Sequence, residues 1–227
     1  MNNRYLSHLT HNSRYSDCID KIYKVIMKQG TSDGLYTQLI SFYHDYHILE
    51  SLIHYYAQSI SQGVNHFYSV GGCSDTFYEY LLKGYIQSHY QDEILIQQFH
   101  QSIQGILSKL VKKSKFNSMQ VIGQLANKRF IHSFELLSCF LPGMLFLYDY
   151  HIFENSNITI DKQARSLLYS CFQLANCTKT GLPAEVTKIS DIKGMNVNQK
   201  QKMYLLRPEI IESFYYLKEL QKDPIAQ

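Results

Sequence analysis

Residues 205–217 read LLRPEIIESFYYL, and this stretch carries the chemistry of a helix start. Pro208 suits the first helical turn, since its missing N–H has no intrahelical partner there, and it pushes Arg207 toward an extended conformation. Glu209 then falls in the first turn, where free N–H groups and the helix dipole favour a carboxylate, and Glu212 follows on the same face. Two carboxylates and a guanidinium therefore converge at one helix end. Simple helix capping explains this pattern about equally well, so the stretch alone leaves the choice open.

A second stretch, residues 71–83 with the sequence GGCSDTFYEYLLK, repeats this design. Its two glycines permit a tight turn, and Ser74 or Thr76 can cap the helix that follows. Thr76 and Glu79 also have the spacing of a capping box. We therefore expect Asp75 to lie at the mouth of a helix, so that acids stand at two separate helix starts.

The composition is that of a globular protein without a strong charge. The chain has 227 residues, 45% of them hydrophobic, and a formal net charge of +3. This is enough apolar content for a core and too little positive charge to indicate nucleic-acid binding. The clustered Lys109, Lys112, Lys113 and Lys115 are better explained as solvating the end of a helix. The sequence shows no N-terminal basic-then-apolar signal and, by inspection, no apolar run of membrane-spanning length.

Apolar residues recur at helical spacing along most of the chain, which predicts an all-α protein of helical pairs joined by short links. We expect the helix at residues 15–28 to face the core. We also expect one extended passage at residues 118–124 and a long polar connection over residues 175–204. Pro142 and Gly143 are expected to interrupt a helix. The predicted helices cover residues 15–28, 46–59, 74–88, 91–112, 134–150 and 160–174.

Residues 36–70, which are dense in Tyr, His, Ser and Gln, are the least readable part of the sequence. His44, Asp45 and His47 are possible metal ligands by type, but their spacing matches no zinc pattern. A packing or surface role is therefore the better explanation of these three residues.

Six motifs give the chain a resemblance to a known family. In their order and approximate spacing they are similar to the class I α-1,2-mannosidases, glycoside hydrolase family 47, which include mannosidase-like proteins of endoplasmic-reticulum degradation. The motifs around Asp75, Cys139 and Glu209 are the most specific, and together the six cover nearly the whole chain. They are residues 4–10 (RYLSHLT), 33–35 (DGL), 75–83 (DTFYEYLLK), 138–143 (SCFLPG), 180–185 (TGLPAE) and 205–213 (LLRPEIIES).

The resemblance implies an (α/α)7 barrel, which is a toroid of paired antiparallel helices. Residues 1–227 are then one partial catalytic domain from the middle of that barrel, with an extended insertion at residues 36–70. The acid that the family usually places just upstream of the first motif is expected to lie outside this chain. In such a barrel, helix starts at one end converge on a central pocket, and we expect Asp75, Glu185 and Glu209 to do so.

An inverting glycosidase uses one carboxylic acid to protonate the leaving oxygen and one carboxylate to activate water, about 6.5–9.5 Å apart. Matched motif by motif, the resemblance implies Glu209 as the general base and Asp75 as a second essential acid. Glu185 matches an acid often assigned as a proton donor, although the family's stronger candidate lies upstream. Arg207 and Glu212 are implied as substrate-binding residues, and a structural ion pair is an equal alternative for Arg207.

The resemblance also implies a calcium ion, a high-mannose N-glycan substrate and a place in the endoplasmic reticulum or Golgi lumen. No nucleic-acid partner is expected from the low net charge, and any membrane anchor is expected only N-terminal to this chain. The threonine that binds the family's calcium falls beyond Gln227, so no direct metal ligand is expected here. Leu136, with Glu135 beside it, stands where the family commonly has a histidine, which implies the loss of a sugar contact.

A disulfide between Cys139 and Cys171 is a further implication of the resemblance, because the family motif around Cys139 usually pairs with a cysteine on the following helix. Cys18, Cys73 and Cys177 stay unassigned. Five cysteines neither prove nor exclude a bridge, and buried free thiols in a reducing compartment are the alternative. The triplets at Asn157–Thr159 and Asn176–Thr178 are possible glycosylation sites, which weakly favours the lumen.

Two functions therefore stay open on the sequence. The first is an α-1,2-mannosidase that trims N-linked high-mannose glycans. The second is a non-catalytic fragment or a glycan-binding relative without a complete site. Because catalysis needs both an acid and a base, we expect little or no mannose release from the 227-residue chain alone.

Overall fold

The computed structural model describes residues 2–28, 33–37, 67–115, 119–154, 157–190, 194–197 and 202–222. The predicted helix at residues 46–59 and the three possible metal ligands at residues 44–47 lie outside the described residues. Most of the predicted insertion therefore has no structural description.

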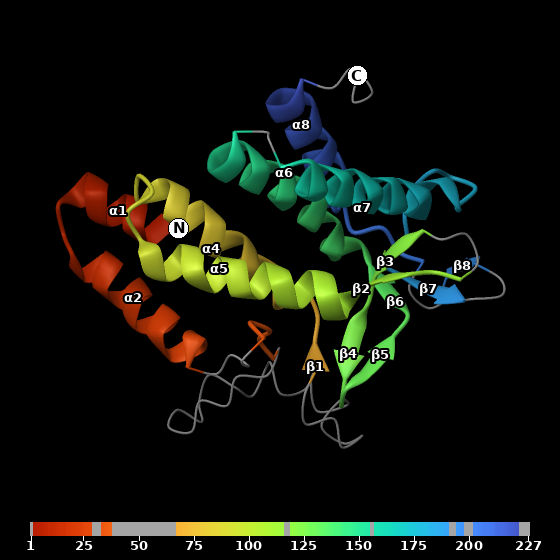
Figure 1. The fold of residues 1–227 in the computed structure, drawn as a ribbon, viewed down its shortest axis with the longest axis horizontal. Coiled ribbons are helices and arrows are strands. Elements are labelled where there is room, and N and C mark those ends of the chain that lie inside the picture. Colours follow the sequence, from red (N-terminus) through yellow and green to blue (C-terminus); the bar gives the residue numbers. More distant parts are fainter. Residues whose placement is uncertain are drawn as a thin grey trace.

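Helices form most of the described chain and pack as neighbours in sequence, as the short links predicted. They are α1 (Asn2–Thr10), α2 (Arg14–Met27), α4 (Asp75–Gln87), α5 (Glu93–Gly105), α6 (Phe140–Phe153), α7 (Ile158–Asn176) and α8 (Glu209–Gln221). α1 packs against α2 and α4 against α5, while α6 contacts α4, α7 and α8 (Figure 1). α6 is thus the central helix, and it holds the two acid-bearing helices α4 and α8 in one array.

The N-terminal pair is tied to the rest by Arg4 of α1. Its guanidinium contacts Asp20 of α2 at 2.7 Å and Asp92, the N-cap of α5, at 3.1 Å. The helix predicted to face the core at residues 15–28 is α2, which packs one face against the core although it contains no fully buried residue. Tyr23 and Ile26 are partly buried against the core, while the opposite face of the helix is exposed.

α6 begins later than predicted and is not interrupted. Residues Ser133–Glu135 form the strand β6, and Leu136–Cys139 form a 3-10 turn before the helix. Pro142 then lies in the first turn of α6, where its missing N–H costs no intrahelical bond. The predicted break at Pro142 and Gly143 was therefore wrong, since the helix starts just before them and runs on to Phe153.

Short strands occupy more of the chain than the sequence indicated. They are β1 (Phe67–Tyr68), β2 (Val111–Lys113), β3 (Gln120–Ile122), β4 (Gln124–Ala126), β5 (Arg129–Ile131), β6, β7 (Val186–Ser190) and β8 (Gly194–Val197). They form three antiparallel sheets with the orders β1-β4-β5, β2-β3 and β6-β7-β8. Figure 1 shows them around the C-terminal end of α5, with β1, β4 and β5 below it and the other strands beyond it. The mainly helical expectation holds, but the long polar connection predicted over residues 175–204 contains β7 and β8.

The segment Leu136–Phe153 is the most apolar part of the core. It is long and apolar enough to cross a membrane by length and composition, which the inspection of the sequence had missed. However, 72% of this segment is buried inside the fold. Its apolar surface is therefore covered by neighbouring helices, which is what a core helix requires.

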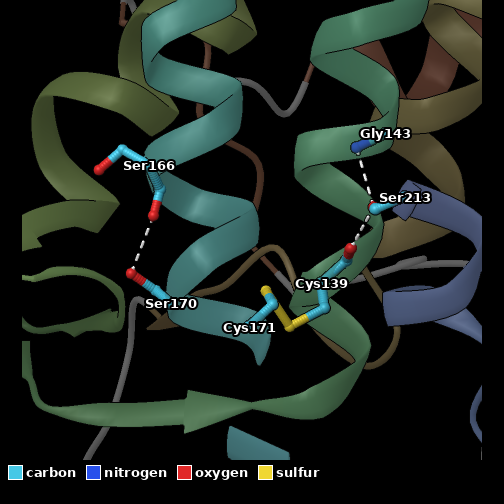
Figure 2. The surroundings of a disulfide bond; sticks show 6 residues. All are labelled: Cys139, Gly143, Ser166, Ser170, Cys171 and Ser213. Atoms are coloured by element: carbon cyan, nitrogen blue, oxygen red, sulfur yellow. Dashed lines mark hydrogen bonds between the residues drawn. A yellow bond between two sulfur atoms is a disulfide. The ribbon is translucent and has the colours of Figure 1, made fainter. Parts of the chain in front are cut away.

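The predicted disulfide between Cys139 and Cys171 is confirmed, with 5.8 Å between the two Cα atoms (Figure 2). It joins the start of α6 to α7, and both cysteines are fully buried. Cys18, Cys73 and Cys177 are free and exposed. The bridge therefore fixes the start of the central helix α6 against α7, and α8 contacts this same end of α6.

Candidate active site

Asp75 and Glu209 are each the first residue of a helix, α4 and α8 respectively. The structure brings the two carboxylates into electrostatic range, since the charge of Asp75 raises the pKa of Glu209 and the charge of Arg207 lowers the pKa of both. Acids from two distant parts of the sequence thus share one region of the surface. Their catalytic roles stay predictions.

Asp75 lies at the start of α4 as predicted, but the capping of this helix differs from the prediction. Ser74 is the N-cap of α4, but its side chain makes no capping bond. Asp75 Oδ1 instead accepts a hydrogen bond from the N–H of Thr76 at 2.8 Å. Burial raises the pKa of Asp75, the bonds from Thr76 lower it, and the charge of Glu79 raises it. The net pKa is above the ordinary value, so this acid holds its proton more tightly than a solvated aspartate.

Glu209 has one oxygen with unused hydrogen-bonding capacity. Pro208 is the N-cap of α8, and its carbonyl accepts from the N–H of Glu212 at 2.7 Å. Burial raises the pKa of Glu209, its backbone N–H and Arg207 lower it, and the charges of Glu212 and Asp75 raise it. Burial therefore outweighs the helix-end stabilisation that the sequence suggested. Among the described residues, Glu209 Oε2 is buried with no hydrogen-bond partner, which is unusual for a carboxylate oxygen.

Glu185 forms an ion pair with Arg207. The guanidinium Nε of Arg207 donates to both carboxylate oxygens, at 3.2 and 3.1 Å, and the N–H of Leu205 donates to Oε1 at 3.3 Å. The ion-pair alternative for Arg207 therefore describes its geometry. Glu185 anchors the segment that leads into α8, and through Arg207 it influences the charge around Glu209.

Glu212 lies deeper along the same face of α8 and interacts with Lys83 of α4. Lys83 Nζ lies 3.6 Å from Glu212 and also forms an ion pair with Glu79. Burial opposes the charge on Lys83, but the hydrogen bond and charge of Glu79 lead the interactions that raise its pKa. Burial raises the pKa of Glu212, and Lys83 partly offsets this. Lys83, which the sequence reasoning missed, thus links the two acid-bearing helices.

The described residues do not by themselves fit a bound calcium ion. Within them there is no group of three or more His, Cys, Asp or Glu side chains that could hold a metal. Glu79 and Glu212 share the ammonium of Lys83, which supplies positive charge between them. We therefore assign no chemical step to calcium.

Glu135 is a further acid of this region that was not among the predicted site residues. It lies at the end of β6, and its carboxylate accepts hydrogen bonds from Ser69, Gly72 and Gln124. Burial raises the pKa of Glu135 most, these three donors lower it, and the charge of Asp75 raises it. The one sequence signal was its place beside Leu136, where the family pattern changes. Its donors come from distant segments, so no local pattern revealed the contact.

Two surface hollows lie elsewhere. One of about 220 Å³ is bordered by Gln173 and Cys177 of α7 and its end, and by Met195 of β8. A second lies around the start of α5, at residues 91–94. Neither is bordered by Asp75, Glu135, Glu185 or Glu209, so we place the candidate site by its chemistry and not by these hollows.

Comparisons with known proteins agree on one family. The sequence pattern of glycosyl hydrolase family 47 matches residues 1–227. The endoplasmic reticulum mannosyl-oligosaccharide 1,2-alpha-mannosidase of Rattus norvegicus is 30% identical, over 97% of this chain and 32% of the relative. Mannosyl-oligosaccharide 1,2-alpha-mannosidase IB of Homo sapiens is 28% identical, again over 97% of this chain and 32% of the relative. The chain thus spans about a third of the length of these curated relatives.

A solved structure gives the same answer for the fold. The alpha-1,2-mannosidase from Trichoderma reesei superposes with a TM-score of 0.72 at 19% sequence identity. The match covers 97% of this chain and 46% of that chain. The described helices are therefore arranged as part of an α/α barrel, as the resemblance implied.

Proposed function

This chain belongs to glycosyl hydrolase family 47, and from that premise we propose that Asp75 and Glu209 form part of the active site of an inverting α-1,2-mannosidase. The substrate class is the high-mannose N-glycan, because the relatives are named mannosyl-oligosaccharide 1,2-alpha-mannosidases. Cleavage of a terminal α-1,2-linked mannose needs a base that activates water and an acid that protonates the departing oxygen.

The observation that carries this proposal is the convergence of two half-buried helix-start carboxylates. Glu209 is the general base, since it matches the family's base in the motif at residues 205–213 and its Oε2 has no hydrogen-bond partner among the described residues. Asp75 is the second acid, and its charge acts on Glu209. Raised pKa values bring both groups closer to neutral pH, where a proton-transfer group is most effective.

Glu185 and Arg207 have a supporting role in this proposal. Both oxygens of Glu185 face the Arg207 guanidinium, so we assign Glu185 to positioning Arg207 and not to proton donation. Arg207 offers its remaining N–H groups to sugar hydroxyls or to the acids. Glu212, held by Lys83, keeps the substrate-binding role that the family motif implies.

The lumen of the endoplasmic reticulum or Golgi is the proposed location. A relative is named as an endoplasmic reticulum enzyme, and the bridge between Cys139 and Cys171 is of the kind that persists in oxidising compartments. Asn176, in one of the two glycosylation triplets, is exposed near the end of α7. These features support entry into the secretory pathway.

Mannose release tests the catalytic proposal. The disulfide-bonded chain is incubated with a high-mannose glycan and calcium, and free mannose is compared between wild type and Glu209→Gln. We expect little release by the wild type and none by the variant, so that any release lost in Glu209→Gln supports the proposal. The matched control is Glu93→Gln, since Glu93 is the exposed first residue of α5 and occupies the helix position that Glu209 has in α8.

A second candidate function is glycan binding without hydrolysis. It is favoured by the ion pair that occupies Glu185, the match to a family proton donor, and by Leu136, which is fully buried and offers no polar atom at the place of the family's histidine. Glycan binding that depends on Asp75 and Glu209, with no mannose release above that of Glu209→Gln, establishes this function instead.

A further inference from the structure

Glu135 lies against the turn that leads into α4. Its Oε2 accepts from the hydroxyl of Ser69 and from the N–H of Gly72, each at 3.2 Å, and its Oε1 accepts from the amide of Gln124 at 2.6 Å. Ser69 and Gln124 are buried, so these bonds lie away from bulk water. A carboxylate with three converging donors has a fixed orientation, because moving it leaves buried groups unpaired.

The Glu135 carboxylate occupies the space that a side chain at residue 71 would need. A Cβ atom placed at Gly71 meets Glu135 Oε2 at 1.6 Å, whereas one placed at Gly72 meets only a methyl of Leu137, at 3.5 Å. The two glycines are therefore not equivalent. The first leaves room for the acid, and the second faces an ordinary van der Waals contact.

The same turn begins α4. The carbonyl of Gly71 accepts from the N–H of Ser74 at 3.1 Å and from the N–H of Asp75 at 3.0 Å. The N–H of Gly71 is held by the hydroxyl of Ser69 at 2.8 Å, and that hydroxyl in turn donates to Glu135. Continuous hydrogen bonds thus run from Glu135 through the turn to the backbone of Asp75.

Glu135 also connects this turn to the other half of the candidate site. It pairs with Val186 of β7, and the next residue, Leu136, donates its N–H to the carbonyl of Glu185 at 2.9 Å. Glu185 anchors Arg207, just before Glu209. The strand β6 is therefore linked to the segments that lead into both helix starts, at Asp75 directly and at Glu209 through Glu185.

We propose that Glu135 is a positioning residue of the glycosidase reaction: through the turn at residues 69–72 it fixes the start of α4 and thereby the carboxylate of Asp75. The reaction role of Asp75 rests on the proposed function, but the hydrogen-bonded link does not. The charge of Asp75 acts on Glu135, while Glu79, Arg207 and Glu209 are the other charged groups that interact with Asp75.

The link is tested without substrate by following backbone amide signals with pH in solution NMR. If Glu135 holds the turn, the amide signals of Gly72 and Ser74 share one titration step with a midpoint above 4.5, the ordinary value for a glutamate. Glu135→Gln removes the step. Asp75→Asn moves its midpoint to lower pH, because the negative charge that raises the pKa of Glu135 is gone. Unchanged titration of both amides in Glu135→Gln overturns the proposal.

Two alanine variants keep the test independent of whether Glu135→Gln folds. Gly71→Ala is expected to disturb the shared titration step and to weaken binding of a high-mannose glycan by about tenfold, the effect of one lost charge-assisted contact. Gly72→Ala, the matched control, leaves both unchanged. Equal behaviour of the two variants contradicts the proposal.

A double variant supplies a rescue. Replacing Glu135 by alanine opens the space beside residue 71, so Gly71→Ala is expected to cost less stability in that background than in the wild type. Equal costs in the two backgrounds also contradict the proposal. If no protein binds glycan but the titration and rescue appear as stated, the proposed function fails while the structural link stands.

Discussion

The hydroxyl of Ser213 in α8 donates to the carbonyl of Cys139 at 2.6 Å and accepts from the N–H of Gly143 at 2.9 Å (Figure 2). A single buried side chain thus spans the first turn of α6, next to the disulfide that joins α6 to α7. Close approach is possible because residue 143 is glycine: a Cβ there meets the Ser213 hydroxyl at 2.9 Å. This contact fixes α8, and hence Glu209, relative to the core.

Ser213→Ala is expected to lower the free energy of unfolding by about 1–2 kcal/mol, because it leaves buried polar groups with one partner fewer. Urea unfolding measures the change. Ser170→Ala is the control, since the buried Ser170 hydroxyl donates only within its own helix, to the carbonyl of Ser166 at 3.0 Å. A loss for Ser213→Ala no greater than for the control argues against the bridging role.

Loss of the disulfide has a larger expected effect. The bridge closes 32 residues of chain, so Cys171→Ser should reduce the free energy of unfolding by about 3–4 kcal/mol through the entropy of the unfolded state. Cys73→Ser, at an exposed free cysteine, should change it by less than about 0.5 kcal/mol. Denaturant unfolding under non-reducing conditions compares the two variants. Equal stabilities contradict a structural role for the bridge.

Stability should depend on pH through Glu209. Because its folded pKa lies above the ordinary value of 4.5, the folded state keeps this proton to higher pH than the unfolded state does. The resulting stabilisation is fully present below the unfolded pKa and is lost as pH rises through the folded pKa. Glu209→Gln cannot lose the proton, so its stability relative to wild type should increase as pH rises from about 4 to about 7. Denaturant midpoints across this range measure the difference, and a difference that stays constant or decreases is the contrary result.

Arg207 should influence the pKa of both Asp75 and Glu209. Its charge lowers the pKa of Asp75 and of Glu209, so Arg207→Gln is expected to raise both values, whereas Arg207→Lys, which keeps the charge, should change them less. Carbon-detected NMR of labelled carboxyl groups measures this. Arg165→Gln is the control, because Arg165 pairs with Asp161 on α7. Similar shifts in all three variants exclude a specific effect of Arg207.

The helix starts at Asp75 and Glu209 were predictable because their signals are local: glycine or proline, then an acid, then apolar residues at helical spacing. The disulfide followed from the family motif. The extended passage predicted at residues 118–124 is confirmed, since it contains β3. The other short strands were not predicted, because they are specified by distant partners, as β6 is by β7. Glu135 was missed for the same reason, because two of its donors, Ser69 and Gly72, lie 66 and 63 residues away.

The central claim is that Asp75 and Glu209 act in one glycan-binding site, and calorimetric titration with a high-mannose glycan in the presence of calcium tests it most directly. We expect the wild type and Glu93→Gln to bind equally. Asp75→Asn and Glu209→Gln should each weaken binding at least about tenfold, and the double variant should lose less than the sum of the two free-energy changes, as neighbours in one site do. Wild-type affinity in either single variant, or fully additive losses, would contradict a shared site.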